Sequence, residues 1–319
     1  QPGPAPEAAP ANQPGPAPEA ASANQPGPAP EAASANQPGP APAGEPAARP
    51  GGVRERTRSG GRGRTWLAAI SGVEPVAVIP SVLRADTDDA VYLAVVPDPD
   101  SPFPRARAGE VGLAECLALT ETVRAVQAEG TGRAIVAVVD LPSQAYGRLE
   151  ELAGLHQAIA TTVDAYAAAR VAGHPTVAVV VGSAISGGFL AHGLQAAQIL
   201  ALDDPGVEIH AMHKPAAARI TRRTVAELDE LARTVVPLSF DVRDWARLGF
   251  CDGLLDVEDA DAPTAADVES VRRAVAAAVE RARTGPRDLS NRLDSAGARE
   301  LRAASRRVRA VLAEQWQPG

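Results

Sequence analysis

The sequence predicts an α/β fold in which helices cover a largely parallel sheet. Three runs rich in Val, Ile and Ala are typical of strands buried on both faces: 91–96, 134–139 and 177–181. Two long segments with apolar residues at spacings of three and four, 110–129 and 149–171, lie between these strands and are expected to be helices. Because strands alternate with helices, we expect neighbouring strands to run in parallel.

The first 62 residues are expected to be a disordered tail followed by a basic linker. The unit Gln-Pro-Gly-Pro-Ala-Pro-Glu-Ala-Ala begins at Gln1, Gln13 and Gln25, and a shortened copy begins at Gln37. No copy has an aliphatic residue larger than Ala, so the repeats cannot bury a core. Arginines among glycines follow over 49–64. Such a run can touch phosphates, but beside an acidic folded part a solvated linker is favoured.

One domain is expected over 63–285. It should begin near Thr65 with a short helix that buries Trp66, Leu67 and Ile70. The remaining expected elements are short strands at 76–79, 82–83 and 207–212, a strand at 199–202, and helices ending near 197 and spanning 225–235, 240–248 and 268–282. The C-terminal segment, 286–319, is expected to be an amphipathic helix with an Arg-rich face, docked on its own domain or on a partner.

Composition and charge argue against several classes of protein. The 319 residues carry a formal net charge of -8, which disfavours a nucleic-acid binder. No apolar run reaches the length of a membrane span, and no secretory signal is evident. Cys116 and Cys251 are too few for a disulfide framework, so we expect a reducing compartment, the cytoplasm. His210 and His213 lack a convincing third ligand, so no metal site is expected.

Small residues follow the third buried strand, over 182–188. A strand, a tight turn and a helix start would place unsatisfied backbone N–H groups at one point, where they can hold a negatively charged oxygen. The glycines could serve backbone shape alone. Alternatively, the N–H groups of Gly187 and Gly188 form an oxyanion hole, with Ser186 shaping the turn.

A nucleophile elbow is a third interpretation of the same turn. Ala184-Ile-Ser-Gly-Gly188 is a degenerate form of Gly-x-Ser-x-Gly. Such an enzyme also needs an acid and then a histidine on separate downstream loops. His210 and His213 follow Asp203 and Asp204 by only a few residues, which leaves little chain for an acid loop, so the elbow is disfavoured.

A second turn, Asp140-Leu-Pro-Ser-Gln-Ala-Tyr-Gly147, lies between a buried strand and a long helix. Its N–H groups also point outward from a helix start. Two such turns, one strand–helix unit apart, should face the same crevice at the carboxyl ends of parallel strands. Tyr146 could donate a hydrogen bond there, although plugging the turn is favoured.

These turns resemble those of a known family. The segments that carry the resemblance include Phe103-Pro-Arg-Ala-Arg107, Pro142-Ser-Gln-Ala-Tyr-Gly-Arg148 and Gly182-Ser-Ala-Ile-Ser-Gly-Gly-Phe-Leu-Ala-His-Gly193. Together they are similar to the gamma subunit of biotin-independent malonate decarboxylase over about 64–257. More distantly, both turns resemble those of the carboxyltransferase alpha subunit of acetyl-CoA carboxylase. The resemblance implies a crotonase-like (ClpP/crotonase) superhelix of ββα units and a partner beta subunit of the same fold.

The resemblance also implies a function. A beta–gamma heterodimer would decarboxylate a malonyl thioester to an acetyl thioester and CO2. The acyl group would be carried on an acyl carrier subunit through a phosphoribosyl-dephospho-CoA arm, and an alpha subunit would exchange acetyl for malonate. The gamma chain itself would bind no cofactor and no biotin. A carboxyltransferase subunit of a biotin-dependent acyl-CoA carboxylase and a non-catalytic scaffold subunit remain alternatives.

The resemblance assigns roles to both turns. Ser186, Gly187 and Gly188, with Tyr146 and Gly147, would hold an oxygen of the departing carboxyl group or of the enolate, without a metal or a covalent nucleophile. The residues expected to bind substrate are Ser143, Gln144, Ala145 and Ser183. The repeat tail lies outside the family pattern. We also expect Ala in place of Gly188 in some relatives, which would make this glycine dispensable.

Overall fold

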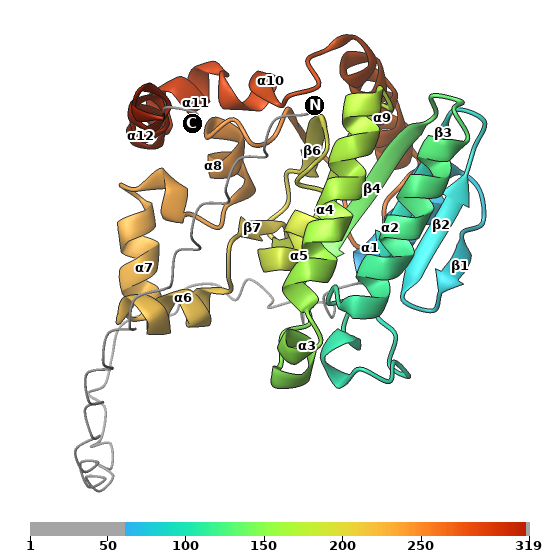
Figure 1. The fold of residues 1–319 in the computed structure, drawn as a ribbon, viewed down its shortest axis with the longest axis horizontal. Helices are drawn as coiled ribbons and strands as arrows, with labels where there is room; N and C mark the ends of the chain where they lie inside the picture. Colours follow the sequence, from blue (N-terminus) through green and yellow to red (C-terminus); the bar gives the residue numbers. More distant parts are fainter. Residues whose placement is uncertain (1–60, 317–319) are drawn as a thin grey trace, which may run out of the picture. The chain divides into compact units, whose positions relative to one another are not determined.

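An eight-stranded sheet forms the centre of the computed structural model, which describes residues 61–316 (Figure 1). The strand order is β1-β2-β3-β4-β5-β6-β8, and β7 pairs with β5. The strands are β1 (Val76–Ile79), β2 (Val82–Asp86), β3 (Ala90–Val95), β4 (Ala134–Leu141), β5 (Thr176–Ile185), β6 (Gln198–Leu202), β7 (Glu208–His210) and β8 (Gly253–Leu255). Only β1–β2 and β2–β3 are antiparallel among these pairs, which confirms the largely parallel sheet. The expected tail lies outside the described residues.

Helices cover both faces of the sheet. α2 (Leu113–Ala128) and α4 (Leu155–Ala172) pack side by side on one face, whereas α1 (Gly61–Ser71) and α9 (Ala265–Thr284) lie on the other (Figure 1). α1 is the expected short helix, and it buries Trp66, Leu67 and Ile70. The helices on both faces explain why the central strands have no polar face.

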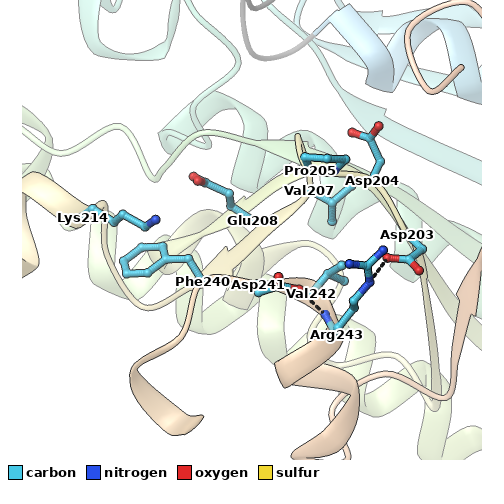
Figure 2. A pocket seen from close by; sticks show the side chains of 10 residues that line it. All are labelled: Asp203, Asp204, Pro205, Val207, Glu208, Lys214, Phe240, Asp241, Val242 and Arg243. Atoms are coloured by element: carbon cyan, nitrogen blue, oxygen red, sulfur yellow. Dashed lines mark hydrogen bonds and ion pairs between the residues drawn. The ribbon is translucent and has the colours of Figure 1, made fainter. Parts of the chain in front are cut away.

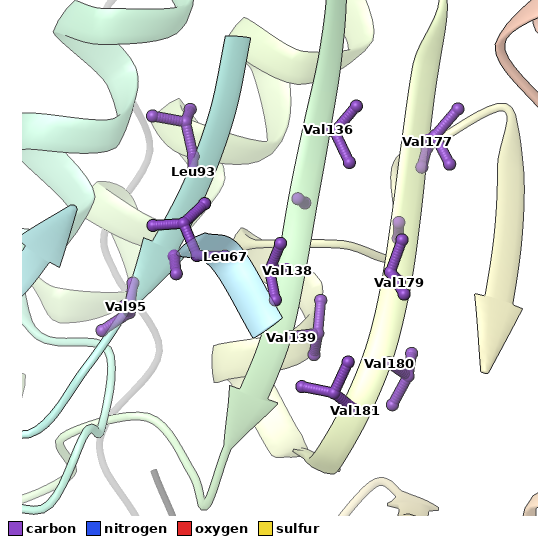
Figure 3. Packing of buried hydrophobic residues seen from close by; sticks show 14 of the residues in the cluster. Leu67, Leu93, Val95, Val136, Val138, Val139, Val177, Val179, Val180 and Val181 are labelled. Carbon is purple, nitrogen blue, oxygen red and sulfur yellow. The ribbon is translucent and has the colours of Figure 1, made fainter. Parts of the chain in front are cut away.

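The core lies around β4 and β5, the two central strands. All eight residues of β4 are buried. β5 begins with Thr176, which is followed by a buried aliphatic run over 177–181. Figure 3 shows Leu67 of α1 and Leu93 of β3 beside the valines of these strands. Each fully buried Val or Leu side chain contributes about 1.5–3 kcal/mol through removal of apolar surface from water. This packing fixes where the carboxyl ends of β4 and β5 lie.

Three expected elements near these carboxyl ends differ in the structure. β5 continues through Ile185, because β7 pairs with Ser183–Ile185 in parallel, so 182–185 is strand and not turn. The expected helix over 149–171 is divided into α3 (Arg148–Leu152) and α4, since Gly154 adopts a φ of 87°. The helix expected to end near 197 is α5 (Ser186–Ala191), which stops six residues earlier.

The C-terminal third contains more short elements than expected. α7 (Val225–Ala232) and α8 (Val242–Arg247) agree with the prediction, whereas α6 (Lys214–Thr221), β8 and the 3-10 turns Pro104–Ala106 and Val236–Leu238 were not predicted. In place of one helix within 286–319 there are α10 (Ser290–Leu293), α11 (Ala296–Leu301) and α12 (Ala303–Gln315). α10 is fastened by the Arg292 guanidinium, which donates to the carbonyls of Leu194 and Ala196. Among the described residues, no helix is long and apolar enough to cross a membrane.

Candidate active site

The structure brings the two predicted turns into direct contact at the carboxyl ends of β4 and β5. These strands pair in parallel, so both turns leave the same edge of the sheet. A Cβ atom added at Gly188 would lie 2.5 Å from the carbonyl oxygen of Ser143 and 2.9 Å from its carbonyl carbon. Both contacts are to backbone, which no side-chain rotation can relieve. This close approach disfavours any residue larger than glycine at position 188 of this chain.

Ser186 shapes the first turn, as predicted for that residue. It has a φ of 61°, a conformation that costs a non-glycine residue about 1–3 kcal/mol. Its hydroxyl donates to the carbonyl oxygen of Ala211 at 2.8 Å, which helps to hold the strained conformation. No hydrogen bond joins this hydroxyl to a histidine within residues 61–316. The geometry therefore gives the nucleophile-elbow interpretation no support.

Gly187 and Gly188 are the second and third residues of α5, so no intrahelical carbonyl can accept their N–H groups. The N–H of Gly187 donates to Oε1 of Gln144 in the second turn at 2.8 Å. A Cβ at Gly187 would lie 3.2 Å from Cδ of Gln144 and 3.0 Å from Cδ1 of Ile159 in α4. The site thus already holds one carbonyl oxygen against a helix-start N–H group.

The second turn is anchored to a neighbouring loop through its backbone. The N–H of Val111 donates to the carbonyl of Ser143 at 3.1 Å, and the N–H of Ala145 donates to the carbonyl of Val111 at 2.9 Å. Ala145 is also 1% exposed. Its N–H and its methyl group are therefore both used within the fold, and the structure leaves little of Ala145 for a substrate.

Two side chains of this turn differ in their surroundings. Tyr146 is 55% exposed, so it does not plug the turn within this chain, contrary to the favoured expectation. Ser143 is 5% exposed, and its Oγ has no hydrogen-bond partner within the described residues. A buried hydroxyl without a partner costs about 1–3 kcal/mol, so this atom calls for a functional explanation.

Gly147 caps α3 in an extended conformation, with φ -171° and ψ 168°. A Cβ there would collide with Oε2 of Glu150, a buried carboxylate of α3, and would lie 3.5 Å from Cγ of Arg105. The close carboxylate explains the glycine, since φ alone would allow any residue. Arg105 brings an exposed cationic side chain next to the second turn, a neighbour that the sequence analysis did not single out.

Asp140 fastens the ends of the two strands, a role that the sequence analysis missed. Its Oδ1 accepts from the N–H of Ser183 at 3.1 Å, and its Oδ2 accepts from the N–H of Arg62 at 3.2 Å. A Cβ at Gly182 would collide with Oδ1 of Asp140, so the glycine makes room for the carboxylate. The predicted substrate-binding residue Ser183 therefore has its N–H engaged by the fold. In the sequence, the one indication of this contact is an Asp near the end of one predicted strand and a Gly near the end of the next.

His192 lies fully buried behind the first turn. Its Nε2 lies 3.2 Å from the carbonyl oxygen of Leu93, which can only accept, so Nε2 carries the proton. Nδ1 then accepts from the hydroxyl of Tyr166 at 2.8 Å. Burial lowers the pKa of His192 from 6.5 to about 4 and raises that of Tyr166, so both are neutral at pH 7. The pair supports α5 from α4 and β3.

A cavity of about 220 Å³ is lined by residues of the segment between β6 and β7, of β7 itself and of the start of α8 (Figure 2). Carboxylates dominate its lining: Asp203, Asp204, Glu208 and Asp241, together with Lys214 and Arg243. Arg243 pairs with Asp203 at 2.7 Å, and Lys214 lies 5.3 Å from the ring centroid of Phe240. An acidic lining repels an anionic substrate, which favours the two turns over this cavity as the reaction site. No group of three His, Cys, Asp or Glu side chains within 61–316 is arranged to hold a metal ion.

A family model for the malonate decarboxylase gamma subunit matches residues 106–316, which include both turns. The chain belongs to the malonate decarboxylase gamma subunit family. It is 49% identical to a chain of a Pseudomonas malonate decarboxylase hetero-tetramer crystallised in complex with coenzyme A, with a TM-score of 0.73. That match covers 80% of this chain and 99% of the Pseudomonas chain. The resemblance inferred from the two turns and their flanking segments is confirmed.

Two further comparisons show that this malonate decarboxylase gamma-type chain is similar to proteins named as carboxyltransferases, one in sequence and one in fold. It is 32% identical over 253 residues to the malonyl-S-ACP:biotin-protein carboxyltransferase MADD of Malonomonas rubra, covering 76% of this chain and 85% of that protein. A transcarboxylase 12S structure shares the fold at 21% identity, with a TM-score of 0.55 over 73% of this chain and 44% of the other. The expected crotonase-like fold is confirmed.

Proposed function

We propose that this chain, together with a partner subunit, decarboxylates a malonyl thioester to an acetyl thioester and CO2. The observation that carries the proposal is the contact between two helix-start turns, in which the N–H of Gly187 already holds a carbonyl oxygen at 2.8 Å. Family membership supports the same reaction. The Pseudomonas MdcD–MdcE hetero-dimer, 48% identical with a TM-score of 0.71, supports a two-subunit enzyme.

The chemistry needs charge stabilisation more than a nucleophile. The bond between the α-carbon and the carboxylate breaks, CO2 leaves, and the electron pair remains as an enolate with its charge on the thioester oxygen. Uptake of one proton at the α-carbon then gives the acetyl thioester. In our proposal the N–H groups of Gly187 and Gly188 face such an oxygen. One preorganised N–H donor of this kind typically stabilises a transition state by about 2.7–4 kcal/mol. The turn at Tyr146 and Gly147 completes the hole.

The remaining predicted residues have supporting roles in this proposal. Ser143 offers a buried hydroxyl with no partner in the described residues, suited to an oxygen of the substrate. Gln144 lies directly against Gly187, and Ser183 contributes to the floor of the site through Asp140. Arg105 adds positive charge beside Gly147, favourable for an anionic malonyl group. For Ala145 the proposal retains only an anchoring role.

The proposed substrate arrives on a partner. We assign the malonyl group to a phosphoribosyl-dephospho-CoA arm of an acyl carrier subunit, regenerated by an alpha subunit. A beta subunit of the same fold completes the pocket, and this chain binds no biotin. The coenzyme A in the related Pseudomonas hetero-tetramer supports a CoA-like arm. The exposed side chains of Tyr146, Leu149 and Leu152 beside the second turn suit cover by a partner. The cytoplasm is the proposed compartment, since Cys116 and Cys251 are free thiols.

A carboxyltransferase is the second candidate, because the Malonomonas rubra relative transfers the carboxyl group to a biotin protein. Both reactions pass through the same enolate, and they differ in the fate of the carboxyl group. CO2 release from a malonyl thioester by the purified complex, measured with avidin present, separates them. Avidin-resistant release supports the decarboxylase, whereas release that requires a free biotin protein supports the carboxyltransferase.

Gly187→Val tests the site itself. The added side chain would occupy the space beside Gln144 and Ile159, where the oxygen of the substrate must enter. We expect CO2 release to fall below detection while the complex with the partner subunit still forms, as measured by size-exclusion chromatography. A variant complex with undiminished CO2 release would instead identify this chain as a non-catalytic scaffold.

A further inference from the structure

The proposed oxyanion hole contains its own acceptor. The amide oxygen of Gln144 takes the hydrogen bond of the Gly187 N–H at 2.8 Å, which is the bond that a thioester or carboxyl oxygen would need. The Gln144 amide carbon also lies 3.2 Å from the position of a Cβ at Gly187. A substrate oxygen and this side chain therefore cannot use the donor at the same time.

We propose that the side chain of Gln144 is a latch, which closes the Gly187 donor in the resting enzyme and swings out when the substrate enters. The latch rests on the proposed function, because it assumes that Gly187 receives the substrate's oxygen. It determines how tightly a malonyl thioester binds, and it keeps water away from the donor between turnovers.

The anchoring of the turn allows this movement. The backbone on both sides of Gln144 is fixed to Val111 by the hydrogen bonds of Ser143 and Ala145. The side chain is half-buried, so its rotation leads to solvent without unfolding the turn. One rotation about side-chain bonds thus opens the donor at little structural cost.

A second observation marks the same place as a ligand site. Ser143, the residue before Gln144, is 5% exposed and its hydroxyl has no partner in the described residues. Buried hydroxyls are nearly always hydrogen-bonded. An open hydroxyl on the residue before the glutamine that closes the donor therefore suits an incoming oxygen. The carbonyl of Ser143 touches Gly188, which puts this residue at the hole.

The latch has a measurable consequence for binding. Substrate exchanges one hydrogen bond of Gly187 for another, and removing the competitor should tighten binding by about two- to tenfold, the usual net effect of one hydrogen bond. A charged acceptor forms a stronger hydrogen bond than a neutral one. Gln144→Ala should therefore lower the KM for a malonyl thioester, and Gln144→Glu should raise it.

The experiment uses the full chain in complex with its partner subunit and malonyl-CoA as the probe. Steady-state CO2 release gives kcat and KM for wild type, Gln144→Ala and Gln144→Glu. Gln157→Ala, at an exposed position of α4, is the matched control and should behave as wild type. Hydrogen–deuterium exchange of the Gly187 amide without substrate provides a readout independent of turnover, and this exchange should accelerate in Gln144→Ala.

Each outcome of these measurements either supports or overturns the latch. A lower KM with faster Gly187 exchange in Gln144→Ala supports the latch. An unchanged or higher KM overturns it, and a hundredfold fall in kcat would show that Gln144 contributes to the reaction and does not obstruct it. Unchanged amide exchange also overturns the latch, even if the wild-type complex releases no CO2. If the wild-type complex releases no CO2, the proposed function fails, whereas the amide exchange of Gly187 still decides whether the latch exists.

Discussion

Replacement of Gly188 by Ala is the sharpest test of the contact between the two turns. The new Cβ would lie 2.5 Å from the carbonyl oxygen of Ser143, and real Cβ contacts essentially never fall below 3.0 Å. The turns must therefore separate by at least 0.5 Å. Because the opposing atoms are backbone, and Val111 holds that backbone on its other side, no flexible side chain can absorb the movement.

The magnitude follows from two opposing effects. Gly188 lies within α5 at a φ that Ala can adopt, so an unobstructed Gly→Ala change would stabilise the helix by about 0.5–1 kcal/mol. Overpacking of a tight contact costs about 1–3 kcal/mol. The clash therefore wins, and we expect the free energy of unfolding to fall by about 1–2 kcal/mol. A shift of this size in the donors should also lower kcat by about tenfold, because catalysis is steep in position.

The assay combines denaturant unfolding of the chain with CO2 release by the complex. Gly61→Ala serves as the control, since a Cβ at Gly61 meets no atom within 4 Å. It should leave kcat unchanged and should keep the free energy of unfolding level or raise it by up to about 1 kcal/mol, the helix effect without a clash. If Gly188→Ala retains both the stability and the kcat of the wild type, the two turns do not touch as described, and the oxyanion geometry derived from that contact is wrong.

Three further predictions concern the surroundings of the site. Ser143→Ala removes a buried hydroxyl that has no partner in the described residues, so the free energy of unfolding should stay level or rise by up to about 1 kcal/mol. The KM for malonyl-CoA should rise. A loss of stability would show that the hydroxyl is hydrogen-bonded in the folded protein. Burial lowers the pKa of His192 to about 4, so the unfolded chain takes up a proton near pH 6.5 while the folded chain does not. Stability should therefore fall by about 3 kcal/mol as the pH drops from 6.5 to 4, and this part of the pH dependence of unfolding should disappear in His192→Gln. Gly182→Ala should destabilise by about 1–3 kcal/mol through collision with Asp140, and a double-mutant cycle with Asp140→Ala should show coupling between the two positions; additive effects would contradict the contact.

The strands were predictable because a strand buried on both faces needs apolar residues at nearly every position. The runs at 91–96, 134–139 and 177–181 correspond to β3, β4 and β5, and their parallel order followed from the helices between them. The predicted element boundaries were wrong where a single glycine or a strand distant in the sequence sets the boundary. Gly154 divides the helix expected after β4, and β7 extends β5 to Ile185 through pairing that no local pattern indicates.

By itself, the sequence determined the family and the location of the two turns, because buried valines, small residues and motif order are local properties of the chain. Only the tertiary structure decided what each residue there does. It showed that Gly188 faces the backbone of Ser143, that Asp140 occupies the space beside Gly182, and that Gln144 closes the N–H of Gly187. These contacts join residues more than forty positions apart, at the ends of adjacent strands or in the turns that follow them, and the parallel register of β4 and β5 brings them together.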